Sequence, residues 1–182
     1  MKTAECDILM VPGYTNSGEQ HWQTRWQSRL ATARRIEMAN WEKPVLNEWI
    51  EAIVQCVASS TRPVVLMGHS LGVLAVVHAA PRLRKTVKGA FLVAPPSETA
   101  VLDIPDIDIR FAHVPRDPLP FPSVLIASNS DPFCPILEAE EWAYAWGSAF
   151  TDAGDAGHLN MDSGHGPWPE GLMRFASFLA KI

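Results

Sequence analysis

Short apolar runs, most of them bounded by glycine or proline, recur along the 182-residue chain. The run Ile8–Val11 ends at Pro12-Gly13, and the run Val64–Met67 begins after Pro63 and ends at Gly68. Further runs cover residues 87–94, 124–127 and 149–151, and a weaker one covers 34–38. Apolar runs of this length are typical of strands that are buried on both faces. The pattern therefore predicts about six strands.

Between these runs, apolar residues recur at steps of about four positions, which is close to the period of a helix. Trp22, Trp26 and Leu30 form one such stripe, in a helix predicted to span 20–30. Pro44 suits the first position of a second helix, which continues to Val57. Three more helices are predicted at 71–80, 136–146 and 169–181. Residues 97–121 are rich in proline and lack this periodicity, so we expect a loop-rich excursion there.

The alternation of strands and helices indicates an α/β fold, with a mostly parallel sheet of about six strands and helices on both faces. A chain of 182 residues has the size of one domain, so we expect residues 1–182 to form a single domain. The segment 97–121 is too short for a large lid domain. In parallel sheets, reactive groups gather beyond the carboxyl ends of the strands, and candidate chemistry is sought there.

Composition and charge narrow the class of protein. The chain is 47% hydrophobic and 19% charged, which excludes intrinsic disorder. Its 15 Lys and Arg against 20 Asp and Glu leave a net charge of −5, so nothing favours nucleic acid or an anionic membrane as a partner. Cys6, Cys56 and Cys134 are widely spaced, which argues against a disulfide framework or a zinc site. No run resembles a signal peptide or a membrane span, so we expect a cytoplasmic protein.

The strand at 64–67 is followed by Gly68-His69-Ser70-Leu71-Gly72 and then by an apolar helix. The pattern Gly-x-Ser-x-Gly between a strand and a helix places a serine on a tight, strained turn with its hydroxyl exposed. We therefore predict that Ser70 is a nucleophile and that the amide of Leu71 donates to a developing oxyanion. The alternative is a serine that only caps the helix, between glycines that are needed for packing.

A nucleophilic serine needs a base, and the base needs an acid to orient it. When the serine lies on a turn of this kind, the acid and then the histidine follow it along the chain. Asp131 follows the strand at 124–127, and His158 lies in a glycine-rich loop beyond the strand at 149–151. We predict these two roles for them. The alternative for Asp131 is a turn-capping side chain before a proline. The rival acids are Asp152 and Asp155, and the rival base is His165.

The loop after the first strand, Gly13–Gly18, is expected to lie beside Ser70 and to supply a second oxyanion donor, the backbone N–H of Tyr14. The alternative is a plain glycine turn. The Tyr14 side chain, together with Phe111, Phe121 and Phe133, is predicted to line the substrate pocket. Because no large lid is expected, we predict a shallow, open site.

The remaining candidates are interpreted as structural. His69 adjoins Ser70, but neighbouring side chains on a tight turn point apart. Cys134 is interpreted as a small buried side chain, and His78 as a core histidine whose hydrogen bonds are satisfied. His21 could help to hold the loop that carries Tyr14.

Several of these segments together resemble the small serine hydrolases related to retinoblastoma-binding protein 9. They are Val11-Pro12-Gly13, Gln20-His21-Trp22-Gln23, the turn around Ser70, Ser130-Asp131-Pro132-Phe133 and Gly157-His158. The resemblance spans essentially the whole chain, and its most specific part is the early Pro-Gly loop followed by His-Trp-Gln. It implies a compact α/β-hydrolase fold that lacks the first strands of larger relatives, with a triad at Ser70, Asp131 and His158. The Leu-x-Cys-x-Glu pattern used to bind retinoblastoma protein does not occur, so that partner is not carried over.

The sequence therefore predicts a serine hydrolase that cleaves an ester or related acyl bond of a small molecule through an acyl-enzyme. No metal or organic cofactor is expected, and the protein is expected to be a monomer or a homodimer. Thioesterase and peptidase activity stay open, because a triad does not choose among acyl groups. The competing class is a non-catalytic protein-binding module on a hydrolase scaffold. A third alternative is a redox or metal protein that uses Cys134.

Overall fold

The computed structural model describes residues 1–83 and 87–182. A six-stranded sheet lies at its centre, and each strand runs parallel to its neighbours. The strand order is β2-β1-β3-β4-β5-β6. The strands are β1 (Asp7–Val11), β2 (Ala33–Arg35), β3 (Val64–His69), β4 (Val87–Val93), β5 (Ser123–Ala127) and β6 (Ala149–Asp152). The prediction of about six mostly parallel strands is confirmed.

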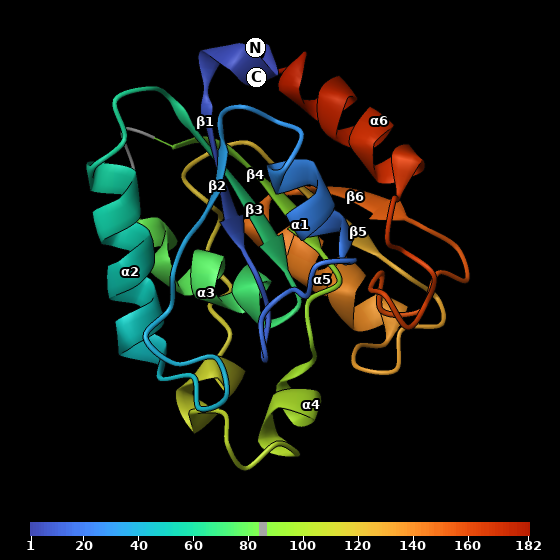
Figure 1. Cartoon of the computed structure of the whole chain (residues 1–182). Coiled ribbons are helices and arrows are strands. Elements are labelled where there is room, and N and C mark those ends of the chain that lie inside the picture. Colours follow the sequence, from blue (N-terminus) through green and yellow to red (C-terminus); the bar gives the residue numbers. More distant parts are fainter. Residues whose placement is uncertain (84–86) are drawn as a thin grey trace.

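Helices cover both faces of the sheet (Figure 1). One face carries α1 (Trp22–Gln27) and α6 (Pro169–Leu179), and the other carries α2 (Leu46–Ala58), α3 (Leu71–Ala79) and α5 (Ile136–Trp146). A shorter helix, α4 (Glu98–Leu102), lies outside these layers, and 3-10 turns cover 3–5, 80–82 and 109–112.

The continuous apolar runs of the strands follow from this double cover. In β1, Ile8 and Met10 belong to the hydrophobic cluster under α1 and α6, whereas Leu9 and Val11 belong to the cluster under α2, α3 and α5. Because successive side chains of a strand point to opposite faces, each position must be apolar when both faces are buried.

Several element boundaries differ from the predicted ones. Helix α1 ends at Gln27, so Leu30 lies beyond it, and Pro44 precedes α2, whose first helical residue is Leu46. The Asp108 carboxylate accepts a hydrogen bond from the Leu46 amide at 3.0 Å. A distant side chain therefore binds one of the free amides at the start of this helix.

The segment 97–121 holds helix α4 and the 3-10 turn Ile109–Ala112, and nothing in it forms a lid domain. Two of its aromatic side chains, Phe111 and Phe121, are 0% and 6% exposed and belong to the core under α2, α3 and α5. The segment therefore closes one end of the core instead of standing over the sheet as a separate layer.

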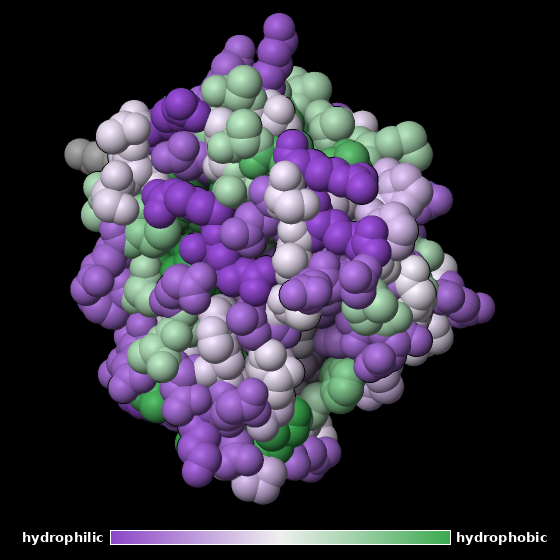
Figure 2. All heavy atoms as spheres, in the orientation of Figure 1, coloured by the Kyte–Doolittle hydropathy of each residue, from purple (hydrophilic) through white to green (hydrophobic). Residues whose placement is uncertain are grey.

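The two ends of the chain lie side by side (Figure 1), where the Met1 ammonium donates hydrogen bonds to the carbonyl oxygens of Leu179 (2.7 Å) and Ile182 (3.1 Å). Within the described residues, no helix has both the length and the apolar character needed to span a membrane. The face seen in Figure 2 carries mostly hydrophilic side chains, and its hydrophobic ones are spread in small groups. This face presents no broad apolar patch.

Candidate active site

The strand order reverses direction at β1, which has β2 on one side and β3 on the other. Loops that follow the strands at such a reversal diverge, and they leave a crevice at the carboxyl edge of the sheet. The loop Gly13–Gly18 follows β1, and Ser70 follows β3. The register pairs Val11 with Gly68, so both loops leave the sheet at the same level.

Ser70 lies on a strained turn between β3 and α3. Its backbone has φ 55° and ψ −130°, a region that costs a residue other than glycine about 1–3 kcal/mol. The flanking glycines leave room for this turn: a Cβ at Gly72 would overlap the carbonyl oxygen of Val11, and one at Gly68 would make a tight contact of 3.1 Å with the backbone nitrogen of Val73. The Ser70 side chain makes no capping hydrogen bond to α3, so the helix-cap alternative is wrong.

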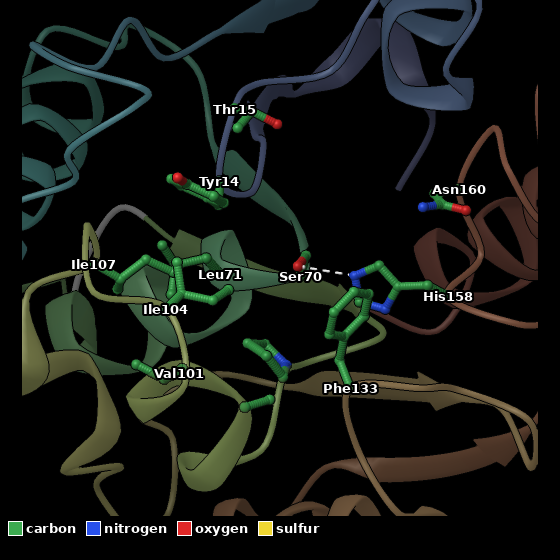
Figure 3. A pocket seen from close by; sticks show the side chains of 12 residues that line it. Tyr14, Thr15, Ser70, Leu71, Val101, Ile104, Ile107, Phe133, His158 and Asn160 are labelled. Carbon is green, nitrogen blue, oxygen red and sulfur yellow. Dashed lines mark hydrogen bonds between the residues drawn. The ribbon is translucent and has the colours of Figure 1, made fainter.

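Three predicted side chains, from the loops after β3, β5 and β6, meet at this turn. The Ser70 hydroxyl donates to His158 Nε2 at 2.9 Å (Figure 3). His158 Nδ1 donates to the two Asp131 carboxylate oxygens at 2.9 and 3.0 Å. The side chains of His158 and Asp131 are only 9% and 2% exposed. The arrangement can carry a proton from the hydroxyl to the imidazole and stabilise the resulting charge.

Asp131 also serves the turn role that was its alternative, because its Oδ1 accepts from the Phe133 amide at 2.9 Å. The same bond orients the carboxylate toward His158. The rival acid Asp152 is exposed, and it accepts from Asn129 Nδ2 at 3.0 Å. The rival base His165 lies 3.3 Å from the Ser163 hydroxyl through Nδ1. The structure therefore brings Asp131 and His158, and not these rivals, to Ser70.

Two serines after β5 hold the loop that carries His158. Ser128 Oγ donates to the Gly154 carbonyl (3.0 Å) and accepts from the Ala156 amide (2.9 Å). Ser130 Oγ accepts from the amide of Gly157 (3.0 Å), whose φ of 56° is left-handed. The sequence analysis missed both serines, although their position in the polar run directly before Asp131 was a usable signal.

The opposite side of this loop is held by two donors from the amino-terminal half of the chain. His69 Nε2 donates to the His158 carbonyl and Trp22 Nε1 to the Leu159 carbonyl, both at 2.9 Å. Burial holds the pKa of His69 well below its ordinary value, and the neighbouring His21 and His158 lower it further. His69 is therefore neutral at pH 7. It contacts the backbone of His158 and supports the site, as its structural interpretation predicts.

The side chain of Gln23, which is 0% exposed, joins two strand ends to the loop after β1. Its Nε2 donates to the carbonyls of Met67 (3.1 Å) and Val11 (3.4 Å), and its Oε1 accepts from the Ser17 hydroxyl (2.7 Å). This explains why a glutamine follows His-Trp in the sequence. The sequence analysis noted the residue without assigning it a role.

Arg35, at the end of β2, braces the same loop. Its Nη1 donates to Asn16 Oδ1 (2.7 Å) and to the Ser17 carbonyl (3.0 Å). Thr15 and Asn16 have φ of 62° and 69°, a left-handed conformation that side-chain-bearing residues rarely adopt. The arginine therefore helps to hold two unfavourable residues next to Tyr14. Its position in a weak predicted strand gave no sign of this contact.

The two candidate oxyanion donors border a cavity beside Ser70. Leu71 is the first helical residue of α3, so its amide has no acceptor within the helix. The Tyr14 amide has no acceptor among the described residues. Free amides of this kind beside a serine can stabilise a developing oxyanion.

This cavity has a volume of about 200 Å³. Tyr14 and Phe133 line it as predicted, and the Phe133 ring centre lies 4.6 Å from that of His158. The prediction was wrong for Phe111 and Phe121, which are buried in the core and do not reach the cavity. Phe111 instead meets the Trp49 ring at 5.6 Å. The wall consists of aliphatic side chains from α4 and the segment after it, namely Ala100, Val101, Ile104 and Ile107 (Figure 3).

Two other candidates can now be assessed. Cys134 is buried, and burial with the nearby carboxylates of Glu138 and Asp131 raises its pKa to about 12. It therefore stays a thiol and offers no nucleophile near neutral pH. His78 was expected to be a satisfied core histidine, but its Nε2 has no hydrogen-bond partner within the described residues. On α3 it lies beside the Phe111 ring, with the two ring centres 6.4 Å apart.

The fold and the crevice at the reversal of strand order define the class of protein, an α/β hydrolase. The chain belongs to the serine hydrolase family, whose model matches residues 8–177. A protein described as a YdeN-like hydrolase from Pectobacterium atrosepticum is 35% identical, with a TM-score of 0.86 over 97% of this chain and 91% of that one. The resemblance to small serine hydrolases is thereby confirmed at the level of the family.

Two more distant structures share the fold. The ydeN gene product of B. subtilis is 20% identical, with a TM-score of 0.77 over 95% of this chain and 98% of that one. Alpha/beta hydrolase domain-containing protein 10 from mouse is 15% identical, with a TM-score of 0.70 over 96% and 88%. A search of curated proteins found no match.

Proposed function

We propose that this serine hydrolase is an esterase that forms an acyl-enzyme on Ser70. The observation that carries the proposal is the 2.9 Å contact between Ser70 Oγ and His158 Nε2, with Asp131 behind the imidazole and a cavity in front of the hydroxyl. Membership of the serine hydrolase family supports hydrolysis as the reaction class.

In the first half of the reaction, Ser70 Oγ attacks the acyl carbon while its proton passes to His158 Nε2. The Asp131 carboxylate stabilises the imidazolium and holds the ring in place. The amides of Leu71 and Tyr14 stabilise the oxyanion. As the tetrahedral intermediate collapses, the bond to the leaving group breaks, and His158 returns the proton to the departing oxygen.

In the second half, a water molecule repeats the sequence. His158 takes a proton from the water as its oxygen attacks the acyl carbon, and the same two amides stabilise the second oxyanion. The bond between Ser70 Oγ and the acyl carbon then breaks, and the proton returns to Oγ. The products are the free acid and the regenerated enzyme, so no metal or organic cofactor is consumed or needed.

The acyl group is proposed to lie against the aliphatic wall formed by Val101, Ile104 and Ile107. An apolar cavity of about 150 Å³ holds benzene, so a cavity of about 200 Å³ suits an acyl group of about six to eight carbons. A hexanoyl ester is therefore the first substrate to test. We expect the natural substrate to be a small molecule that meets the enzyme in the cytoplasm. We expect the enzyme to be a monomer or a homodimer.

The test is labelling with a fluorophosphonate probe, read by intact and peptide mass spectrometry, together with hydrolysis of p-nitrophenyl hexanoate. One adduct on Ser70 is expected, and Ser70→Ala should remove both the adduct and the hydrolysis. His158→Ala should slow labelling by a factor of about 10³ or more. Ser177→Ala, at an exposed serine of α6, is the matched control and should leave both unchanged. A folded wild-type protein without an adduct would favour the protein-binding alternative.

The type of acyl bond needs a separate comparison. A triad accepts esters, thioesters and amides, and their relative rates depend on the pocket. Hexanoyl ester, thioester and anilide substrates should be compared by kcat/KM, and the proposal requires the ester or thioester to exceed the anilide.

A further inference from the structure

A second cavity, with a volume of about 280 Å³, meets the first at Ser70. The two share Tyr14, Thr15, Ser70, His158 and Asn160. The residues that line only the first cavity are all apolar: Leu71, Pro96, Ala100, Val101, Ile104, Ile107 and Phe133. The residues that line only the second are Gly13, Asn16, Gly18, His21, His69 and Met161. The two sides of the serine therefore differ in polarity, because histidine and asparagine side chains occur only among the residues specific to the second cavity.

His21 lines the second cavity, and its ring nitrogen Nε2 is a buried donor without a partner among the described residues. It is 6% exposed, and its Nδ1 accepts from the Gln23 amide at 3.2 Å as the cap of α1. A neutral imidazole that accepts through Nδ1 carries its proton on Nε2. Burial, and to a smaller extent the Arg35 guanidinium, lower the pKa of His21 to about 4, so the ring is neutral at pH 7. Its Nε2 has no hydrogen-bond partner among the described residues.

A second donor group lies at the boundary of the two cavities. Asn160 Oδ1 accepts from the Ser163 amide (3.1 Å) and hydroxyl (3.0 Å). Its amide nitrogen consequently turns toward the side of Ser70 (Figure 3). The Thr15 hydroxyl borders the same space. Donors from three segments thus surround a cavity whose matching ligand groups are oxygen acceptors.

We propose that the second cavity binds the leaving group of the substrate, and that it selects an alcohol with several oxygen atoms, such as a polyol, through the N–H of His21 Nε2. This inference rests on the proposed esterase function and deepens it. The preferred substrate class is then an ester between a short apolar acid and a hydroxyl-rich alcohol.

The order of the two reaction steps decides which cavity takes which half of the substrate. His158 protonates the leaving group, and it later deprotonates the water that attacks the acyl-enzyme, so both must approach the same nitrogen. Water enters a cavity only where polar groups can bind it. The second cavity offers such groups, whereas an aliphatic wall does not. The leaving group therefore departs, and water arrives, on the side of His21, and the acyl chain stays on the side of Ile104.

The test compares two hexanoate esters whose alcohols have equal numbers of heavy atoms, 1-hexanoylglycerol and pentyl hexanoate. Each kcat/KM is divided by the rate constant for hydroxide-catalysed hydrolysis of the same ester, which removes the intrinsic reactivity of the leaving group. The wild-type enzyme is expected to favour the glyceryl ester by about tenfold or more, the effect of one or two neutral hydrogen bonds.

His21→Asn keeps a side chain that caps helices well but removes the Nε2 donor. The glyceryl-to-pentyl ratio is expected to fall by about tenfold. His113→Asn makes the same exchange at an exposed position and should leave the ratio unchanged. A structural defect would lower both rates together without changing the ratio.

The outcomes separate the two levels of the proposal. A wild-type enzyme that cleaves both esters without preference would overturn the inference, whether or not the His21 variant folds. An unchanged ratio in a folded His21→Asn protein would do the same. Both results leave the esterase function standing. If neither ester is cleaved and fluorophosphonate leaves Ser70 unlabelled, the proposed function itself fails, and this inference with it.

Discussion

The candidate site has two parts that are built in different ways. One is the edge that carries Ser70, Asp131 and His158, which we call the reactive edge, and the other is the apolar wall of the cavity. Ser70, Asp131 and His158 each follow a strand end, and the sheet brings the three loops together. The wall comes from residues 100–107, a segment without strand or helix periodicity over most of its length. Strand ends can be located from apolar runs, but the direction of an aperiodic segment cannot. Consequently the sequence located Ser70 and the two side chains that meet it, and it misplaced two of the three phenylalanines predicted for the wall.

The largest expected effect separates two of the three aspartates that were candidates for the acid beside His158. Asp131→Asn keeps the shape of the side chain but removes the charge that stabilises the His158 imidazolium, so kcat/KM for p-nitrophenyl hexanoate should fall by about 10³–10⁴. Asp152→Asn changes an exposed carboxylate that contacts Asn129, and it should alter kcat/KM less than about threefold. Similar losses of kcat/KM in both variants would mean that Asp131 has no special role beside His158.

The next comparison sharpens the contrast between wall and core. Phe111→Ala empties a fully buried site and should lower the free energy of unfolding by about 3–5 kcal/mol. Ile104→Ala removes carbons from the cavity wall and should lower the hexanoate-to-acetate ratio of kcat/KM by about tenfold. Urea unfolding and a two-substrate assay measure the two effects. If Phe111→Ala changed acyl selectivity without loss of stability, Phe111 would belong to the pocket after all.

Two glycines near the serine turn test how strongly the reactive edge depends on close backbone packing. Gly72→Ala pushes a methyl group into the carbonyl oxygen of Val11, a backbone atom that cannot swing away, and should cost about 3 kcal/mol or more. Gly18→Ala has open space around the new methyl group and an ordinary φ, so its effect should stay within about 0.5 kcal/mol. Urea denaturation of both variants is the measurement. Equal stability would mean that the turn relaxes more easily than its geometry indicates.

The last expected effect, a gradual one, is the pH dependence of stability caused by the neutral histidines next to the site. The pKa of His21 is about 4 in the folded protein, and that of His69 is also lowered, whereas an unfolded histidine has a pKa of about 6.5. The unfolded chain therefore binds more protons as the pH falls below about 6.5, which destabilises the folded state by at most about 1.4 kcal/mol per pH unit for each histidine. Above that pH the two contribute no such slope.

This slope is measured as the free energy of unfolding in urea at several pH values from 7.5 to 4.5. The His21→Asn variant should show a shallower slope between pH 6.5 and 4.5, because one of the two groups no longer titrates. Arg35 and His158 are the charged or titratable neighbours that lower the pKa of His21, so the difference should decrease in Arg35→Met. A stability that rises toward pH 4.5 would contradict the neutral state of these rings.

Local sequence determined the strands, the serine turn and the strand ends at which Ser70, Asp131 and His158 follow one another. These features depend on local rules. A strand that is covered on both faces appears as a continuous apolar run, and a serine with a left-handed φ on this kind of turn has glycine two positions before and after it. Gly68 is readable for that reason, because its closest backbone neighbours, Gly72 and Val73, belong to the turn itself. The closest neighbour of Gly72 is Val11, which only the tertiary structure brings there. The predicted strand nevertheless ended too early, since pairing with β4 carries β3 through His69.

Tertiary structure alone decided which distant residues support the site. Gln23 reaches the ends of β1 and β3, Arg35 reaches Asn16, and Ser128 reaches Gly154. Tertiary structure also decided that His21 would reach the polar cavity and Phe111 would not. The physical reason is that a hydrogen bond or a cavity wall needs two surfaces at a set distance, and a residue's own neighbours in the sequence specify only one of them.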